Sequence, residues 1–271
     1  MEWHEITDPD DWQAQAGPAL QQAWAYGVAL GRLGAQVRRG AVIRDGRALM
    51  VAQMLERRRV RLIHQPHFPG PASRAPLRRM ARHLGATIAS CPLTGPGVIP
   101  LVTARHHAIL DLRPAADSLR RGLHGKWRNR LLASRITPAK GRERHLSELL
   151  THEGAQSTAR GYRGLPMAFA QAWPGATLML HWSPRGQMQA GMLFLIHGRA
   201  ATYHCGWTSE EGRKAEAHRA LLWQAILRLQ AGGIERLDLG AVDSDNPGLA
   251  RFKLGTGAML ENLGPTSLIL P

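Results

Sequence analysis

The sequence is poor in cysteine, in acidic residues and in long apolar runs. Its 271 residues include only Cys91 and Cys205, too few for a disulfide framework or a cysteine-rich zinc cluster. No apolar run approaches the roughly 18 residues that a membrane-spanning helix needs. The first residues, MEWHEITDPDD, are acidic where a secretory signal is basic. We therefore expect a globular cytoplasmic protein, with peripheral contact at the inner face of the membrane left open.

The shortage of acids leaves the chain strongly basic. Asp and Glu total 20 against 35 Lys and Arg, a formal net charge of +15, while 44% apolar residues suffice for a packed core. A surplus of this size favours polyanionic partners such as nucleic acid, anionic lipid head groups or phosphate-rich cofactors. The alternative is a merely basic, solvated surface, since the Ala, Arg, Gly and Pro usage is typical of GC-rich coding.

Two common classes of catalytic site are also missing. The 13 histidines include the pairs His64–His67 and His106–His107, but neither has carboxylate or cysteine partners at a zinc-site spacing. There is no G-x-S-x-G nucleophile motif, and neither cysteine has an activating context. We therefore expect no metal, no resident cofactor and no hydrolytic nucleophile.

The first part of the chain predicts helices and strands in one lobe. A helix is expected over 18–34, followed by three strand-like runs between residues 36 and 68. The dipeptide Asp45-Gly46 indicates a hairpin between the first two runs. A basic helix that ends at Gly85 precedes two more strands, and the lobe ends near Pro114. The predicted domains are therefore 1–113 and 114–271.

The second part opens with a predicted helix over 115–135 that has a basic face. Arg121, Arg128 and Arg135 recur every seven residues and would stack along one side of it. Between residues 117 and 144 there are nine Lys or Arg against two acids, Asp117 and Glu143. Such a face suits sequence-independent contacts with the phosphates of a nucleic acid. The alternatives are a solvated helix face and attraction to an anionic membrane surface.

The stretch 207–257 predicts a helix, a strand and a second helix in succession. An amphipathic helix carries Leu222, Ile226 and Leu229 on one stripe, which predicts packing on a sheet. A strand follows, with Leu237 and Leu239 on one face and Asp238 on the other. Asn246 and Pro247 then indicate the cap and first residue of another helix.

Several motifs resemble the Fem-type aminoacyltransferases, a branch of the Gcn5-related N-acetyltransferase (GNAT) superfamily. They are "QQAWAYGVALGRLG", the LLW helix, "G…LDLG" and "NPGLARFKLGTG". The resemblance implies an α/β fold of two GNAT-like lobes, each a mixed, largely antiparallel sheet flanked by helices. It also implies transfer of an amino acid from aminoacyl-tRNA, or of an acyl group from acyl-CoA, to an amine.

The resemblance places the catalytic region at Phe252 and Lys253. The Phe-Lys pair of "RFKLGTG" matches the family pair whose lysine stabilises charge on the donor, and a fixed cation beside a developing oxyanion lowers the barrier. Asp238 and Asp243 are the carboxylates available as a general base. The alternatives are a surface lysine for Lys253 and a loop-ordering acid for Asp238.

The expected donor site departs from that of an ordinary CoA-dependent GNAT enzyme. The superfamily pattern R/Q-x-x-G-x-G/A falls on 213–218, where Glu216 replaces the first glycine. A carboxylate there would repel the pyrophosphate that a helix N-terminus normally holds. Arg213 and Lys214 remain candidates for another phosphate, and the Fem branch shares this loss because its donor is a tRNA ester.

Candidate acceptor residues come from both lobes. Trp24 and Tyr26 could line a groove, although aromatic residues at helical spacing are more often core. Arg160, Tyr162 and Arg163 lie where the family keeps an arginine and aromatics near the acceptor's phosphate, but their spacing matches poorly.

We predict a monomeric N-acyltransferase that uses aminoacyl-tRNA and an amine acceptor of the peptidoglycan-precursor, peptide or lipid-like class. The alternatives are an acyl-CoA-dependent enzyme and, from another class, a non-catalytic module that binds RNA or a membrane surface.

Overall fold

The computed structural model describes residues 1–57, 60–85, 87–161 and 165–271, which divide into two compact units. Unit 1 comprises 1–106, 168–174 and 262–271, and unit 2 comprises 107–167 and 175–261. The chain first leaves unit 1 between His106 and His107, a few residues before the boundary predicted at Pro114. The later return of two short segments to unit 1 was not foreseen from the sequence.

Unit 1 contains a mixed sheet with strand order β1-β2-β3-β4-β5-β12, in which only the β4–β5 pairing of the described strands is parallel. The last residues of β12, Thr266–Ile269, pair with β5. Its elements are β1 (Glu2–Glu5), α1 (Pro9–Gln15), η1 (Leu20–Gln22), α2 (Trp24–Arg32), β2 (Gln36–Arg44), β3 (Arg47–Arg57), β4 (Val60–His64), α3 (Arg74–Leu84), β5 (Thr87–Ser90) and most of α7 (Met167–Ala172).

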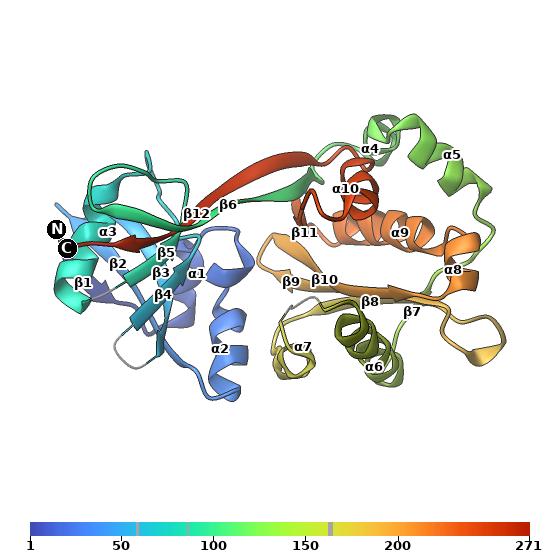
Figure 1. Ribbon diagram of the computed structural model, residues 1–271, viewed down its shortest axis with the longest axis horizontal. Coiled ribbons are helices and arrows are strands. Elements are labelled where there is room, and N and C mark those ends of the chain that lie inside the picture. The colour runs from blue at the N-terminus through green and yellow to red at the C-terminus, as the bar shows by residue number, and fades with distance from the viewer. Residues whose placement is uncertain (58–59, 86, 162–164) are drawn as a thin grey trace. The chain divides into compact units, whose positions relative to one another are not determined.

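In unit 2 the strand order is β6-β11-β10-β9-β8-β7, and the β10–β11 pairing is parallel. Helices α9 and α6 cover opposite faces of its strands (Figure 1). Its elements are β6 (Val98–Asp111), α4 (Ala116–Gly122), α5 (Gly125–Ala133), β7 (Ala139–Lys140), α6 (Glu143–Arg160), β8 (Thr177–Trp182), η2 (Pro184–Gly186), β9 (Ala190–His197), β10 (Ala200–Thr208), α8 (Glu210–Lys214), α9 (Ala217–Ala231), β11 (Arg236–Ala241), α10 (Pro247–Leu254) and β12 (Met259–Ile269). Strands β6 and β12 each begin in one unit and end in the other.

The predicted fold class, mixed sheets flanked by helices, is confirmed. The predicted hairpin joins β2 and β3, with Arg44 paired to Arg47 across Asp45-Gly46. The predicted cap of α10 is also present, because the Asn246 side chain accepts a hydrogen bond from the backbone N–H of Leu249 at 3.1 Å. None of the helices within the described ranges is long and apolar enough to cross a bilayer.

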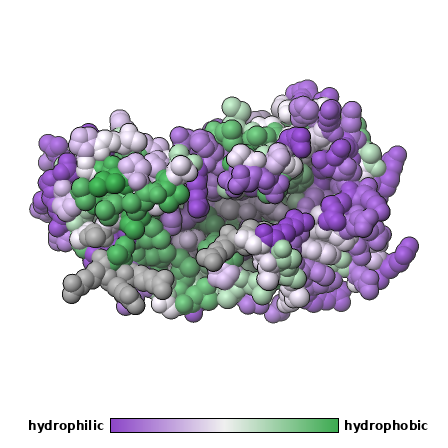
Figure 2. All heavy atoms as spheres, viewed as in Figure 1, coloured by the Kyte–Doolittle hydropathy of each residue, from purple (hydrophilic) through white to green (hydrophobic). Residues whose placement is uncertain are grey.

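The single helix predicted over 115–135 is wrong, because the segment is broken into α4 and α5. Leu123 has an extended backbone, with φ −62° and ψ 134°, and Gly122 and Gly125 on either side favour the break. Leu123 is buried, on the inward side of the segment, as expected. Arg121 therefore lies on α4, Arg128 on α5 and Arg135 beyond α5, so the three do not stack along one helix. The surface over α4 and α5 is nevertheless largely hydrophilic (Figure 2).

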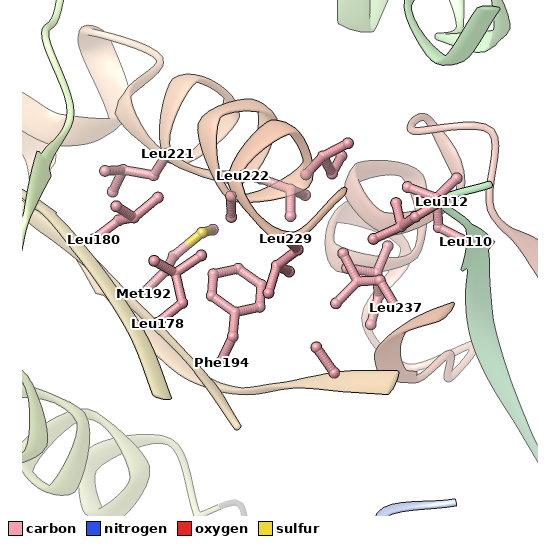
Figure 3. Packing of buried hydrophobic residues seen from close by; sticks show 14 of the residues in the cluster. Leu110, Leu112, Leu178, Leu180, Met192, Phe194, Leu221, Leu222, Leu229 and Leu237 are labelled. Atoms are coloured by element: carbon pink, nitrogen blue, oxygen red, sulfur yellow. The ribbon is translucent and has the colours of Figure 1, made fainter. Parts of the chain in front are cut away.

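The core of unit 2 lies between α9 and the sheet. The predicted stripe of α9 is buried, with Leu222, Ile226 and Leu229 at most 2% exposed, and it packs against Phe194 of β9 and Leu237 of β11 (Figure 3). Burying side chains of this size stabilises the fold by about 1.5–3 kcal/mol each. This packing fixes β11, and with it every residue on the opposite face of β11.

Candidate active site

The candidate site is built on the polar face of β11. Leu237 and Leu239 point into the core beneath α9, so Asp238 must point to the other face. In the parallel pairing of β10 with β11, Asp238 lies directly opposite Thr202. A strand that is apolar on one side and acidic on the other thus places a carboxylate between β6 and β10.

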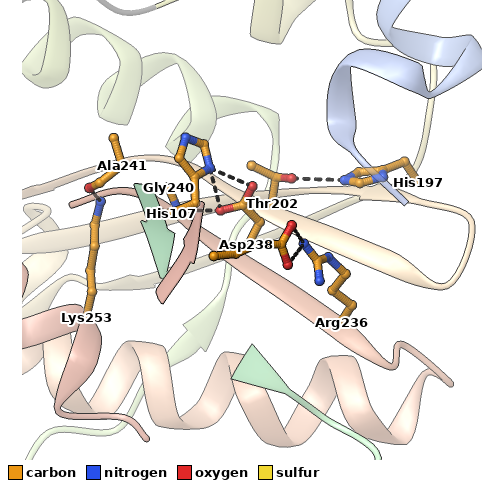
Figure 4. Close-up of polar contacts among 9 residues, drawn as sticks. His107, His197, Thr202, Arg236, Asp238, Gly240, Ala241 and Lys253 are labelled. Atoms are coloured by element: carbon orange, nitrogen blue, oxygen red, sulfur yellow. Dashed lines mark hydrogen bonds and ion pairs between the residues drawn. The ribbon is translucent and has the colours of Figure 1, made fainter. Parts of the chain in front are cut away.

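Polar side chains from four neighbouring strands form a row across this face (Figure 4). His197 Nε2 on β9 lies 2.9 Å from Thr202 Oγ1 on β10. Asp238 on β11 binds His107 Nδ1 on β6, at 3.0 Å from Oδ1 and 2.9 Å from Oδ2. Burial lowers the pKa of His197 to about 4, although the charge of Asp238 acts in the opposite direction. His197 is therefore neutral at physiological pH.

A bulge at Gly240 joins this row to Lys253. The pairing of β11 with β6 shifts register between Asp238 and Ala241, and Gly240 has φ +80°, a conformation that glycine adopts without a steric penalty. The Gly240 N–H donates to Asp238 Oδ1 at 2.7 Å. The carbonyl of Ala241 is thereby turned toward α10, where Lys253 Nζ donates to it at 2.7 Å.

Lys253 is a buried cation. The residue is 5% exposed, and burial lowers its pKa from 10.5 to about 8, while the charges of Asp238 and Asp243 raise it. A cation held in this way can meet charge that develops on a reacting carbonyl oxygen, because few waters compete for it. Lys253 is therefore not the surface lysine that was left as an alternative.

The two other residues predicted near Lys253 have different environments. Phe252 packs beside Trp127, with ring centroids 6.3 Å apart, and its backbone carbonyl accepts a hydrogen bond from Trp127 Nε1 at 3.0 Å. Phe252 therefore anchors α10 to α5. Asp243 is exposed in the loop after β11 and reaches the site through its charge on Lys253.

Two of the predicted donor residues, Arg213 and Lys214, lie on α8, just before the start of α9. Arg213 donates to the Thr208 carbonyl at 3.0 Å, and Lys214 forms an exposed ion pair with Glu210 at 2.8 Å. Glu216 is the N-cap of α9 in the left-handed conformation, with φ 55°. Its carboxylate forms an ion pair with Arg219 in the first turn and lies 3.6 Å from Arg130 of α5.

The predicted acceptor residues are spread over both units. Tyr26 is 6% exposed and packs on Phe169 with ring centroids 5.3 Å apart, which fits the core alternative. Trp24 is half-buried beneath the guanidinium of Arg39, 3.8 Å from the ring centroid. Arg160 is exposed at the end of α6. Tyr162 and Arg163 lie outside the described residues.

Sequence reasoning missed His107, His197 and Thr202. His107 was considered only as half of a metal-binding pair, and the described residues contain no group of three metal-ligating side chains. Alternation along β6 could have placed His107 on the face opposite Leu110 and Leu112. Its partner Asp238, 131 residues away, is found only when the strand order is known.

Comparison with known proteins identifies the family of the chain. A family model described as an acetyltransferase (GNAT) domain matches residues 111–254, more than half of the chain. The chain belongs to this GNAT family. No curated protein matches it.

Solved structures extend the likeness to the whole chain. The crystal structure of FemX has a TM-score of 0.77 at 16% identity, covering 100% of this chain and 98% of that one. The C-terminal domain of a putative lysylphosphatidylglycerol synthetase from Agrobacterium fabrum has a TM-score of 0.54 at 12% identity, covering 97% and 93%. A tandem GNAT protein from the clavulanic acid biosynthesis pathway has 0.53 at 14%, covering 98% and 97%. These structural likenesses establish the fold. Membership of the GNAT family supports the predicted enzyme class, an acyltransferase.

The buried charge of Lys253 predicts a pH-dependent difference in stability between the GNAT protein and its Lys253→Met variant. The unfolded chain keeps the lysine proton up to the ordinary pKa of 10.5, whereas the folded chain releases it at about 8. Between these values folding releases a proton, so the stability of the wild type should rise relative to the variant by up to about 3 kcal/mol. Below about pH 8 the difference should be constant, with the wild type carrying the full penalty of burying the ammonium.

Denaturant unfolding at several pH values between about 7 and about 10 measures this difference. Lys214→Met, which changes an exposed lysine on α8, is the matched control and should leave the pH dependence of stability unchanged. Parallel stability curves for the wild type and Lys253→Met would contradict the account of Lys253 as a buried cation.

Proposed function

We propose that the protein transfers an aminoacyl group from aminoacyl-tRNA to an amine acceptor of the peptidoglycan-precursor, peptide or lipid-like class. The observation that carries this choice of donor is Glu216 at the start of α9. The amine would attack the ester carbonyl, and Lys253 would stabilise the oxyanion that forms. The rival donor within the same fold is acyl-CoA.

Glu216 argues against pyrophosphate at α9. A helix N-terminus binds phosphate through its free N–H groups and its positive dipole end. Here that end already has a carboxylate beside its first turn, and the ion pairs with Arg219 and Arg130 hold it there. A second anion would have to displace Glu216 or lie against it. A tRNA donor needs no phosphate at this position, because its acyl group is attached to the ribose at the end of the chain.

The basic segment around α4 and α5 supports an RNA partner. Lys126, Arg130 and Arg135 are exposed, as is Arg121, which donates to Ser118 Oγ at 2.9 Å. Only Arg130 of these forms an ion pair within the described chain, with Glu216. Unneutralised cations of this kind bind phosphates and release counterions when they do so. The support comes from charge and exposure, because the seven-residue stacking predicted from the sequence is absent.

The proposed donor predicts that acetyl-CoA will not bind appreciably to the wild type in calorimetry. Glu216→Gly removes the carboxylate and suits the left-handed backbone, so any CoA binding should be stronger in this variant. Glu210→Gly, on exposed α8, controls for charge alone. A micromolar dissociation constant for the wild type, about −8 kcal/mol, would instead favour acyl-CoA as the donor.

The basic segment predicts salt-dependent tRNA binding that particular arginines support. The double reversal Arg121→Glu with Arg135→Glu should reduce the slope of log affinity against log salt by about 2, roughly one for each phosphate that is no longer neutralised. The melting temperature should change little, because both side chains are exposed. Filter binding over a range of salt concentrations measures the slope.

The matched control is Arg47→Glu with Arg82→Glu, which makes the same charge change at exposed positions of unit 1. Equal slopes for the two double variants would mean that net charge alone attracts tRNA and that the basic segment is only a solvated surface.

A further inference from the structure

His107 is held in one orientation by a carboxylate. Its Nδ1 lies within 3.0 Å of both oxygens of Asp238. An ionised carboxylate can only accept hydrogen bonds, so Nδ1 must carry the proton. In the neutral imidazole, Nε2 is then unprotonated and offers its lone pair.

Asp238 is itself fixed, which makes the orientation of His107 rigid. Its strand is pinned by the buried neighbours Leu237 and Leu239, and the Gly240 N–H donates to Oδ1 at 2.7 Å. The side chains of His107 and Asp238 are 16% and 17% exposed, so they are shielded from bulk water but reachable. Within the described part of the chain, Nε2 of His107 has no hydrogen-bond partner. It is also not one of the fully buried unpaired atoms.

His107 and Lys253 meet at the same bulge. Ala241 lies opposite His107 in the pairing of β11 with β6, and its carbonyl accepts the hydrogen bond of Lys253 Nζ. A cation and a proton acceptor are thus brought to the two sides of one residue (Figure 4). This is the pair of groups that attack of an amine on a carbonyl requires.

The other candidate bases are less suited to the role. Asp238 is already engaged by His107 and Gly240. Asp243 is exposed in its loop. His197 uses Nε2 to contact Thr202, and its pKa of about 4 makes it a weak base.

We propose that His107 is the catalytic proton acceptor of this enzyme and that Asp238 is its positioning residue. The inference deepens the proposed function and depends on it. As the acceptor nitrogen forms its bond to the acyl carbon, His107 Nε2 takes one proton from that nitrogen. As the bond from the acyl carbon to the ribose oxygen breaks, the same proton passes to that oxygen, which leaves as a hydroxyl. No proton, electron or co-reactant is left over, and a thioester donor would be balanced in the same way through sulfur.

Neighbouring charges influence the pH dependence of transfer. Asp238 is the charged group bonded to His107. The other charged or titratable side chains on β6, β11, β12, α10 and the polar row, within the described residues, are Arg105, His106, Asp111, Arg236, Glu261, Arg251, Lys253 and His197, with Asp243 in the adjoining loop.

The decisive experiment is single-turnover transfer as a function of pH for the full chain, with both aminoacyl-tRNA and acetyl-CoA tried as donors. His107→Gln keeps a side chain that can bind Asp238 but cannot accept a proton. It should lower the rate about 100-fold or more and remove the rise of rate with pH at the acidic end. In steady-state turnover, Asp238→Asn should lower kcat with little change in KM, because it loosens the orientation of His107 without touching the acceptor.

Two variants keep the result specific. His106→Gln changes the adjacent exposed histidine and should leave both rate and pH profile within about twofold. Lys253→Met should lower the rate about 100-fold but retain the acidic rise, because His107 is still present. A His107→Gln enzyme within about threefold of the wild type, with the same rise, would overturn the proposal.

Nitrogen-15 NMR of histidine-labelled protein tests the tautomer without any substrate. The expected result is a protonated Nδ1 and an unprotonated Nε2 on His107 above the acidic rise. A proton on Nε2 there would also overturn the proposal. If the wild type transfers from neither donor, the proposed function fails and the role of His107 fails with it. If it transfers only from acetyl-CoA, the proposed donor fails, and the same variants still decide the role of His107.

Discussion

The site depends on the two-sided character of β11. Leu237 and Leu239 are buried under α9. Because side chains alternate along a strand, Asp238 lies on the opposite face. The bulge at Gly240 then ends the regular pairing, so that one short segment presents a carboxylate to His107 and a carbonyl to Lys253. Hydrophobic burial supplies the energy that fixes the strand, and the polar groups on its other face need only local hydrogen bonds to be positioned.

Much of the fold could be predicted, because its signals are local. The stripe of α9, the alternation of β11, the Asp45-Gly46 hairpin and the Asn246 cap each act over a few residues, and all are present. The helix predicted over 115–135 failed at Leu123, whose extended backbone ends α4. Gly122 and Gly125 on either side favour the break.

The site could be predicted only in part, for a physical reason. Lys253 and Asp238 were identified from motifs near each other in sequence. His107 and Thr202 reach Asp238 through strand pairings that no local pattern encodes. For Tyr26 the helical spacing left a groove or a core position open, and its contact with Phe169, from a distant helix, is what places it in the core. A single amino-acid sequence does not reveal which distant strands pair with each other.

We propose that aminoacyl-tRNA supplies the group that this GNAT protein transfers. The most direct measurement offers the full chain a pool of tRNA carrying labelled aminoacyl groups and, separately, labelled acetyl-CoA, each with the same mixture of amine acceptors. The label bound to acceptor as an amide is then followed over time. The account predicts amide formation from the tRNA pool and none above background from acetyl-CoA. Amide formation from acetyl-CoA alone would contradict it.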